Sequence, residues 1–361
     1  MSTTASDGIK TMFAYRFKPD SVDPVKEEIP VPTIAPDEVL VQVLASGVCH
    51  SDLSVLNPNN PVNHAMKSAL RAPGFTMGHE GAGIIVALGS AVSDEYPQLS
   101  KGTYVAVYAP NACLKPLCVA CVSGRTNLCR VHSTLGLGND GSWAPYVAVR
   151  AASAIPIPAD PQTLLPAVAA IATDAVVTPY HALRTSVKEG QIVLCLGTGG
   201  VGLNAVAIAK SCCGASSVVA CDVRESSRTQ AMDAGADHVT HPDDLLKYLA
   251  EKNIFVDVAI DFVGTQTTFE LCFAALRPGG TINLIGFAGP PLQVNPLITM
   301  SKDLNLRILF WGTRDELVEV LQAIVDGKLK PKVETRPMSE CVQVLQELRE
   351  GKLKNRVVLI P

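Results

Sequence analysis

The chain lacks the features of several protein classes. Its 361 residues contain no run of the roughly 18 uninterrupted apolar residues that a membrane helix needs. The opening segment, MSTTASDGIK, has no apolar stretch typical of a secretory signal peptide. Positive charge is not in excess either: 30 Lys and Arg stand against 34 Asp and Glu, giving a net charge of -4 with no basic stripe for a nucleic acid or an anionic membrane. We therefore expect a cytoplasmic protein without nucleic-acid or membrane partners.

Cysteine is present in a pattern that disfavours disulfides. The chain has 11 cysteines, an odd number, with a cluster between Cys113 and Cys129. Without a signal peptide, such a cluster favours thiolates that bind metal in a reducing compartment. The cysteines that lie in apolar runs are predicted to be core residues without a further role. These are Cys195, Cys212, Cys213, Cys221, Cys272 and Cys341.

The chain contains two kinds of sequence pattern. Hydrophobic residues make up 47% and charged residues 18%, which predicts a globular protein, and the length favours two domains. From about residue 39 to 150, short β-branched runs such as VLVQVLASGV are broken by Gly and Pro, which indicates β structure. From about residue 171, buried strands such as QIVLCLG alternate with helix-length segments. This alternation predicts an α/β domain with a parallel sheet.

A dinucleotide-binding motif follows the strand QIVLCL and opens a helix. Its glycines permit a tight turn and let backbone amides approach a pyrophosphate at the helix N-terminus. The next strand ends in Asp222, an acidic residue at the distance expected for hydrogen bonds to the adenosine ribose. Because Asp222 repels a 2′-phosphate, we predict NAD, with NADP as the alternative since Arg224 and Arg228 are close enough to pair with a phosphate. The motif consists of Gly197, Gly199, Gly200, Val201 and Gly202.

Two fragments of the β-rich part place metal-binding side chains beside polar partners, GVCHSD at 47–52 and GHEG at 78–81. With the cysteine cluster, the glycine motif and the closing RVVLIP, the chain resembles the medium-chain dehydrogenase/reductase superfamily, in particular its zinc-dependent alcohol dehydrogenases. The resemblance implies a GroES-like β-rich catalytic domain, residues 1–170 and 311–361, and a Rossmann NAD-binding domain, residues 171–310. It also implies an active site in the cleft between these domains and a homodimer or homotetramer.

The resemblance further implies a catalytic zinc held by Cys49, His79 and Asp174. One thiolate, one imidazole and one carboxylate leave a fourth position open, as a catalytic zinc requires. Ser51 resembles the first hydroxyl of a proton relay. Glu80 resembles a residue that contacts the zinc ligands without binding the metal, or one that binds zinc transiently. A salt bridge is the alternative role for this side chain. Taken singly, the three ligands also have structural explanations, namely core packing, a hydrogen-bonded histidine and a helix cap.

Three more residues are implied at the coenzyme. His50 and Arg356 match residues over the pyrophosphate, and Thr178 matches a residue on the nicotinamide side. Many relatives have a histidine where this chain has Ser54, so the proton is expected to leave through ribose hydroxyls and water instead. The implied chemistry is Lewis-acid catalysis by zinc, with a hydride passing between an alcohol carbon and nicotinamide.

The cysteine cluster resembles the structural zinc loop of the same superfamily. Cys118, Cys121 and Cys129 match its last three ligands, and four thiolates would organise a loop with little apolar core. The first ligand departs from the usual spacing, because Cys113 precedes Cys118 with four residues between them and Lys115 occupies the expected place. We predict a complete four-cysteine site; a three-cysteine site and metal-free thiols are the alternatives.

These inferences predict a zinc-dependent alcohol dehydrogenase or carbonyl reductase that uses NAD. A zinc-free quinone or enoyl reductase of the same superfamily is the alternative enzyme, and an inactive binding or structural relative is the alternative of another class. The metal-binding residues count against both. An apolar pocket is expected to favour a bulky secondary or cyclic alcohol. Its predicted lining is the long segment 57–73 with Leu53, Leu56, Phe287, Phe310 and Trp311.

Overall fold

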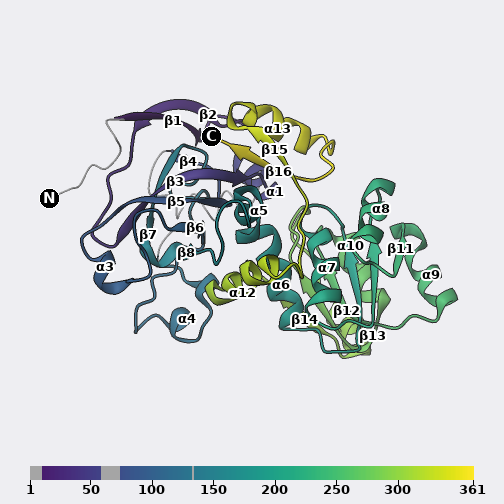
Figure 1. Ribbon diagram of the computed structural model, residues 1–361. Coiled ribbons are helices and arrows are strands. Elements are labelled where there is room, and N and C mark those ends of the chain that lie inside the picture. The colour runs from purple at the N-terminus through teal and green to yellow at the C-terminus, as the bar shows by residue number, and fades with distance from the viewer. Residues whose placement is uncertain (1–9, 58–73, 132–133) are drawn as a thin grey trace. The chain divides into compact units, whose positions relative to one another are not determined.

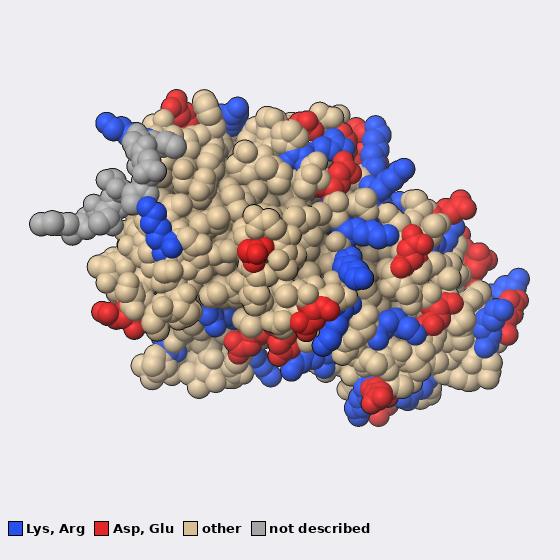
Figure 2. Space-filling model, in the orientation of Figure 1, with Lys and Arg blue, Asp and Glu red and all other residues tan. Residues whose placement is uncertain are grey.

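The computed structural model describes residues 10–57, 74–131 and 134–361, and the chain divides into two compact units. The β-rich unit consists of residues 1–174, 313–326 and 331–361, and the α/β unit of residues 175–312 and 327–330. On the face drawn in Figure 2, basic and acidic side chains lie interspersed on both units. None of the helices in the described part of the chain combines the length and the apolar character needed to cross a bilayer.

Strands dominate the β-rich unit. They are β1 (Thr11–Phe17), β2 (Val25–Pro30), β3 (Glu38–Gly47), β4 (Phe75–Thr76), β5 (Gly81–Leu88), β6 (Tyr104–Val107), β7 (Tyr146–Arg150), β8 (Ala154–Pro156), β15 (Val333–Pro337) and β16 (Arg356–Ile360). Seven form one sheet in the order β15-β16-β3-β5-β6-β8, with β7 paired to β3, and three form a sheet in the order β2-β1-β4. Segments from opposite ends of the sequence lie side by side, because β16 pairs antiparallel with β3 (Figure 1).

Strand β3 connects this sheet to the candidate metal centre. Val39, Val41 and Val43 are β-branched residues at two-residue spacing, and all three are buried. The strand ends at Gly47, where a Cβ atom would overlap the carboxylate of Glu80. Glycine at this position therefore lets the strand end approach the Glu80 side chain directly.

The helices of the β-rich unit are short apart from two near the C-terminus. They are α1 (His50–Leu56), α3 (Val92–Glu95), α4 (Val119–Val122), α5 (Pro166–Ile171), α12 (Arg314–Val325) and α13 (Cys341–Arg349). Helix α12 begins with a capping box, in which Thr313 Oγ1 accepts from the Glu316 amide and the Glu316 carboxylate accepts from the Thr313 amide. Its apolar face buries Leu317 and Val320. Helix α12 is therefore amphipathic and packs its apolar face against the β-rich unit.

The α/β unit contains one six-stranded sheet, and all of its strand pairs are parallel. The strands are β9 (Ile192–Leu196), β10 (Ser217–Cys221), β11 (His238–Thr240), β12 (Val256–Asp261), β13 (Leu276–Leu284) and β14 (Asn305–Ile308). The helices are α6 (Val177–Arg184), α7 (Gly202–Ser211), α8 (Glu225–Asp233), α9 (Leu245–Lys252), α10 (Gln266–Ala275) and α11 (Pro296–Thr299). The order β11-β10-β9-β12-β13-β14 is that of a Rossmann fold, which confirms the predicted fold class.

The core of the α/β unit fixes the strand ends that carry the nucleotide motif. Leu194 on β9, Val219 on β10 and Phe269 on α10 are buried in one cluster, and each such side chain contributes about 1.5–3 kcal/mol. At the carboxyl ends of the strands, the Gly197 amide donates to the Cys221 carbonyl at 2.8 Å. The glycine turn and the end of β10 are therefore held side by side.

Candidate metal centre and nucleotide site

Three separate segments of the β-rich unit form a buried cluster of metal-binding side chains. Cys49 precedes α1, His79 and Glu80 lie just before β5, and Asp174 lies in the π-helical turn Ala172–Val176 that follows α5. One ligand atom from each of the four residues lies within 4.8 Å of the others. The structure thus brings together the three predicted zinc ligands and adds Glu80 to them.

Asp174 contacts two other members of the cluster. Its Oδ2 lies 3.5 Å from Cys49 Sγ and 3.8 Å from His79 Nε2. All four side chains are buried, with exposed fractions from 0% for Glu80 to 9% for Asp174. Such a mixed set of sulfur, imidazole nitrogen and carboxylate oxygen is characteristic of a catalytic zinc site.

Asp52, which was not predicted as a site residue, orients two members of the cluster. Its Oδ1 lies 3.0 Å from His79 Nδ1, and its Oδ2 accepts from the Cys49 amide at 2.8 Å. The side chain is fully buried. A carboxylate on Nδ1 leaves Nε2 for a metal, since it fixes the tautomer and ring orientation. The available signal was the spacing of Cys49 and Asp52, which lets an acid in the first turn of α1 cap the helix start.

Arg356 lies in the same cluster. Its Nε donates to Glu80 Oε2 at 3.1 Å, and its Nη2 contacts Glu80 Oε1 and donates to Asp174 Oδ2 at 3.1 Å. Arg356 is only 6% exposed. The salt bridge that was the alternative for Glu80 is therefore present, whereas the contact of Arg356 with a pyrophosphate stays a prediction.

Burial and close charges shift the pKa values of these groups. Burial raises the pKa of Glu80 to about 8 against the opposing effect of Arg356. Burial also works against the charged form of His79, but Asp52, Asp174 and Cys49 outweigh it and raise the pKa of His79 well above its ordinary value. The pKa of Asp174 is lowered despite burial, because His79 and Arg356 favour its carboxylate. The cluster therefore favours an added positive charge.

The donor set fits a divalent cation. The carboxyl groups of Asp52, Glu80 and Asp174 and the thiol of Cys49 are buried with two basic side chains. Arg356 pairs with Glu80 and Asp174, and His79 pairs with Asp52. Four buried acidic groups beside two basic ones are unfavourable unless protons or a metal balance them. Zinc would supply that balance.

The residues beside Cys49 differ in their surroundings. Ser51 is half-buried, and its Oγ lies 3.5 Å from Cys49 Sγ. His50 is exposed. The hydroxyl of Ser54 donates to the His50 carbonyl at 3.2 Å, a bond within its own helix. Of the two hydroxyls, that of Ser51 contacts a metal-binding atom, whereas that of Ser54 bonds to the backbone of its own helix.

The glycine motif forms a tight turn between β9 and α7. Gly197 has φ +87°, a left-handed conformation that glycine adopts without strain, and a Cβ at Gly202 would overlap the Gly197 carbonyl oxygen. Gly200 and Val201 lead into α7, and Gly199 has space around it apart from the Arg224 guanidinium. This geometry leaves the start of α7 open to close approach by a phosphate group.

Asp222 lies beside this turn at the end of β10. Its Oδ2 accepts from the Thr198 amide at 2.8 Å, and its Oδ1 accepts from the Arg224 amide at 2.9 Å. Asp222 is 7% exposed. These two backbone amides fix the orientation of the Asp222 carboxylate, and its contact with the adenosine ribose stays a prediction. Thr178, predicted at the nicotinamide, is buried near the start of α6.

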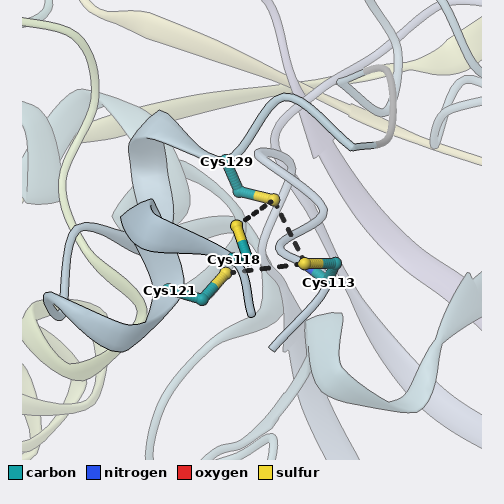
Figure 3. A group of neighbouring side chains, drawn as sticks. All are labelled: Cys113, Cys118, Cys121 and Cys129. Carbon is teal, nitrogen blue, oxygen red and sulfur yellow. Dashed lines mark hydrogen bonds between the residues drawn. The ribbon is translucent and has the colours of Figure 1, made fainter. Parts of the chain in front are cut away.

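Four cysteines form a second cluster at the loop around α4 (Figure 3). Cys113 Sγ lies 3.8 Å from Cys121 Sγ, and Cys118 Sγ lies 3.9 Å from Cys129 Sγ. All four sulfur atoms lie within 4.8 Å of one another. Cys113 joins the others in spite of its unusual spacing because Leu114 adopts the left-handed φ of +48°, which turns the chain.

The sulfur cluster also fits a cation. The Cys121 amide lowers the pKa of Cys118 to about 7, whereas burial raises the pKa of Cys121 to about 12. Adjacent thiolates repel one another, and a metal ion removes this repulsion. Four sulfur donors without an open position are typical of a structural zinc.

Comparison with known proteins identifies the family. Residues 35–159 match the family "Alcohol dehydrogenase GroES-like domain" and residues 200–326 match "Zinc-binding dehydrogenase". An alcohol dehydrogenase of Geobacillus stearothermophilus is 32% identical over 337 residues, which cover 92% of this chain and 95% of that protein. This chain belongs to the zinc-dependent alcohol dehydrogenases.

Solved structures agree with this assignment. An acetophenone reductase from Geotrichum candidum in complex with NAD is 33% identical, with a TM-score of 0.85 and 99% of each chain covered. An alcohol dehydrogenase from Aeropyrum pernix is 28% identical, with a TM-score of 0.86, covering 97% of this chain and 100% of the other. The predicted family is confirmed. This zinc-dependent alcohol dehydrogenase is an oxidoreductase that acts on the CH–OH group of small-molecule donors.

Proposed function

We propose that this enzyme interconverts a bulky or cyclic secondary alcohol and its ketone with NAD. The convergence of Cys49, His79 and Asp174 in one buried cluster supports this function most directly. The likeness to an acetophenone reductase, whose named substrate is an aryl ketone, favours a bulky substrate. Of the residues predicted to line an apolar pocket, Leu56 and Trp311 are buried and Phe287 is 50% exposed. Segment 58–73 lies outside the described residues.

The proposed roles in the metal centre follow from the contacts. Cys49, His79 and Asp174 would hold the catalytic zinc, which when bound supplies a Lewis acid for the substrate oxygen. Asp52 holds the His79 ring. Glu80, paired with Arg356, lies close enough to the ligand atoms to act as a transient ligand. Residues 1–170 and 311–361 would form the catalytic domain.

Ser51 is proposed to receive the proton of the substrate hydroxyl and pass it to solvent. Its half-buried position beside Cys49 supports this role. We expect Ser51→Ala to lower kcat by about 100-fold, the contribution typical of general acid-base catalysis, with a changed pH profile. Ser54→Ala is the matched control and should leave kcat unchanged, since that hydroxyl bonds its own helix. Unchanged kcat of Ser51→Ala across the pH range would remove Ser51 from the relay.

The coenzyme is proposed to bind at the glycine turn of residues 171–310, the NAD-binding domain. NAD supplies the hydride acceptor. The amides at Gly199, Gly200 and Val201 would bind the pyrophosphate, and Asp222 would accept from the ribose hydroxyls. We also propose that His50 and Arg356 contact the pyrophosphate and that Thr178 contacts the nicotinamide side of the coenzyme.

The decisive experiment combines metal analysis with a substrate panel. A content of about two zinc ions per chain would support both metal centres. A content of about one zinc ion per chain would support the catalytic centre alone. Activity with NAD on primary, secondary and cyclic alcohols is then compared before and after chelation. Absence of zinc, or chelation-resistant activity, would refute the proposed function.

We also propose a homodimer or homotetramer in the cytoplasm without nucleic-acid or membrane partners. Strand β14 has one neighbour, β13, among the described strands, and Ile308 on β14 is 75% exposed. Leu297 and Met300, also from the α/β unit, are 74% and 71% exposed. An apolar open sheet edge favours pairing with another chain. Light scattering after size-exclusion chromatography would refute the assembly if it found only monomer.

A further inference from the structure

Helix α6 follows the turn that contains Asp174, and its first residues leave one carbonyl without the usual donor. Asp174 lies in the π-helical turn Ala172–Val176, which leads into α6. In a regular helix the Ala175 carbonyl would accept from the amide four residues later, which here belongs to Pro179. Proline has no amide hydrogen, so this bond cannot form. Because Ala175 is fully buried, its carbonyl needs a donor from elsewhere in the protein.

Asn204 on α7 supplies this donor and contacts the glycine turn with the same group. Its Nδ2 donates to the Ala175 carbonyl at 3.0 Å and to the Gly200 carbonyl at 3.0 Å. Asn204 is half-buried, and α6 packs against α7 within the α/β unit. One side-chain amide therefore joins the backbone next to a metal-binding residue to the backbone of the nucleotide motif.

Both ends of this connection are backbone atoms close to a proposed ligand. Ala175 is joined to Asp174 by a peptide bond. Gly200 lies in the first turn of α7, where the Leu203 amide donates to the Gly199 carbonyl at 3.0 Å. A movement of the chain at Asp174 must therefore stretch the bond from Asn204 to Ala175 or move the amide that holds Gly200.

We propose that Asn204 is a positioning residue that couples metal binding at Asp174 to coenzyme binding at the glycine turn. This inference rests on the proposed zinc and dinucleotide functions. When a metal binds Asp174, the turn before Ala175 loses freedom, and Asn204 transmits this restriction to Gly200. A glycine turn that is already ordered loses less conformational entropy on binding a pyrophosphate. The metal should therefore tighten coenzyme binding, and by linkage the coenzyme should tighten metal binding by the same factor.

The test measures the Kd for NADH by nucleotide fluorescence, without an alcohol substrate, in the zinc-loaded and the metal-free protein. The coupling ratio is the Kd of the metal-free form divided by the Kd of the zinc-loaded form. We expect a coupling ratio of at least about five in wild type, the lower end of common coupling energies. The cysteine cluster loses its metal equally in wild type and variants, so its effect cancels when their coupling ratios are compared.

Asn204→Leu removes the two donors and keeps a side chain of similar size. Its coupling ratio should fall towards one, by about threefold or more, as for the loss of a hydrogen bond between uncharged groups. Asn204→Gln keeps the amide and should recover part of the coupling ratio. If Asn204→Leu does not fold, Asn204→Ala removes the same donors at a helix position that alanine favours.

Asn283→Leu is the matched control, because it removes another amide side chain from the same unit. Asn283 is buried, and its Nδ2 donates to Ser186 Oγ at 2.7 Å. This variant should lower Tm and keep the wild-type coupling ratio. A coupling ratio of one in wild type, an unchanged ratio in Asn204→Leu, or an equal fall in Asn283→Leu would overturn the inference and leave the proposed function in place. Failure of both forms of wild type to bind NADH would refute the proposed function and the inference with it.

Discussion

Replacing Arg356 with Met should strongly destabilise the β-rich unit. The guanidinium contacts the buried carboxylates of Glu80 and Asp174, with its Nε 3.1 Å from Glu80 Oε2 and its Nη2 3.1 Å from Asp174 Oδ2. Removing one partner from such a buried network costs about 3–5 kcal/mol. For a unit of this size, 1 kcal/mol shifts the midpoint by about 2–4 °C, so we expect Tm to fall by about 6–20 °C.

The size of this loss should depend on pH. Burial raises the pKa of Glu80 to about 8 even though Arg356 opposes the shift, so loss of Arg356 raises that pKa further. At about pH 6, Glu80 in the folded variant stays protonated and neutral. At about pH 9, the folded variant must either bury an additional charged carboxylate or keep Glu80 protonated although the unfolded chain ionises it, and both reduce the free energy of unfolding. The difference in Tm between wild type and Arg356→Met should therefore be larger at the higher pH.

Circular dichroism on the metal-free protein measures both effects. Arg349→Met is the matched control, because Arg349 pairs with Asp23 at 35% and 36% exposure, and an exposed pair contributes about 0–1 kcal/mol. Adding Glu80→Gln to Arg356→Met should restore part of the lost stability. If Arg356→Met lowers Tm no more than Arg349→Met does, the buried network does not stabilise this unit and the reasoning is refuted.

Three further predictions concern the sulfur cluster, the glycine turn and the protonation of the buried metal-binding cluster. Cys113→Ser should reduce the metal content from about two zinc ions per chain to about one and lower Tm, measured by elemental analysis and thermal unfolding; an unchanged zinc content would exclude Cys113 as a ligand. Gly202→Ala should raise the Kd for NADH by at least about tenfold, because the added Cβ overlaps the Gly197 carbonyl oxygen and widens the turn; calorimetry showing unchanged affinity would contradict this. In the metal-free protein, the folded-state pKa values of Glu80 and His79 are both raised. Between about pH 5 and 8 the unfolded chain releases protons from these groups that the folded chain retains, so stability should fall with rising pH. The zinc-loaded protein should show less of this fall, because zinc replaces the protons, and equal pH dependence of the two forms would count against the cluster as the metal centre.

The fold was predictable from sequence because its signals are local. The glycine turn lies between a strand and a helix with Asp222 at the next strand end, and these features are encoded within about 30 consecutive residues. The alternation of buried strands and helices is also a local pattern, and it predicted the parallel sheet. Family spacing located Cys49, His79 and Asp174, although their convergence required coordinates.

Other features were not predictable because they depend on distant contacts or unusual backbone. Arg356 meets Glu80 and Asp174 only because β16 pairs with β3, a register set by tertiary packing and not by local pattern. The position of Cys113 depends on Leu114 in a left-handed conformation, which sequence rules assign mainly to Gly and Asn. The contact between Asp52 and His79 could not be predicted from local pattern, because the two residues are 27 positions apart in the sequence and meet only in the folded chain.

Synthesis of the chain imposes an order on the metal centre. Arg356 follows Asp174 by 182 residues and Glu80 by 276 residues. A ribosome must therefore translate the entire α/β unit before the cation that balances these two acids exists. Until then the carboxyl groups stay solvated or depend on protons and His79, and a fragment that ends before residue 356 lacks the arginine that pairs with both acids.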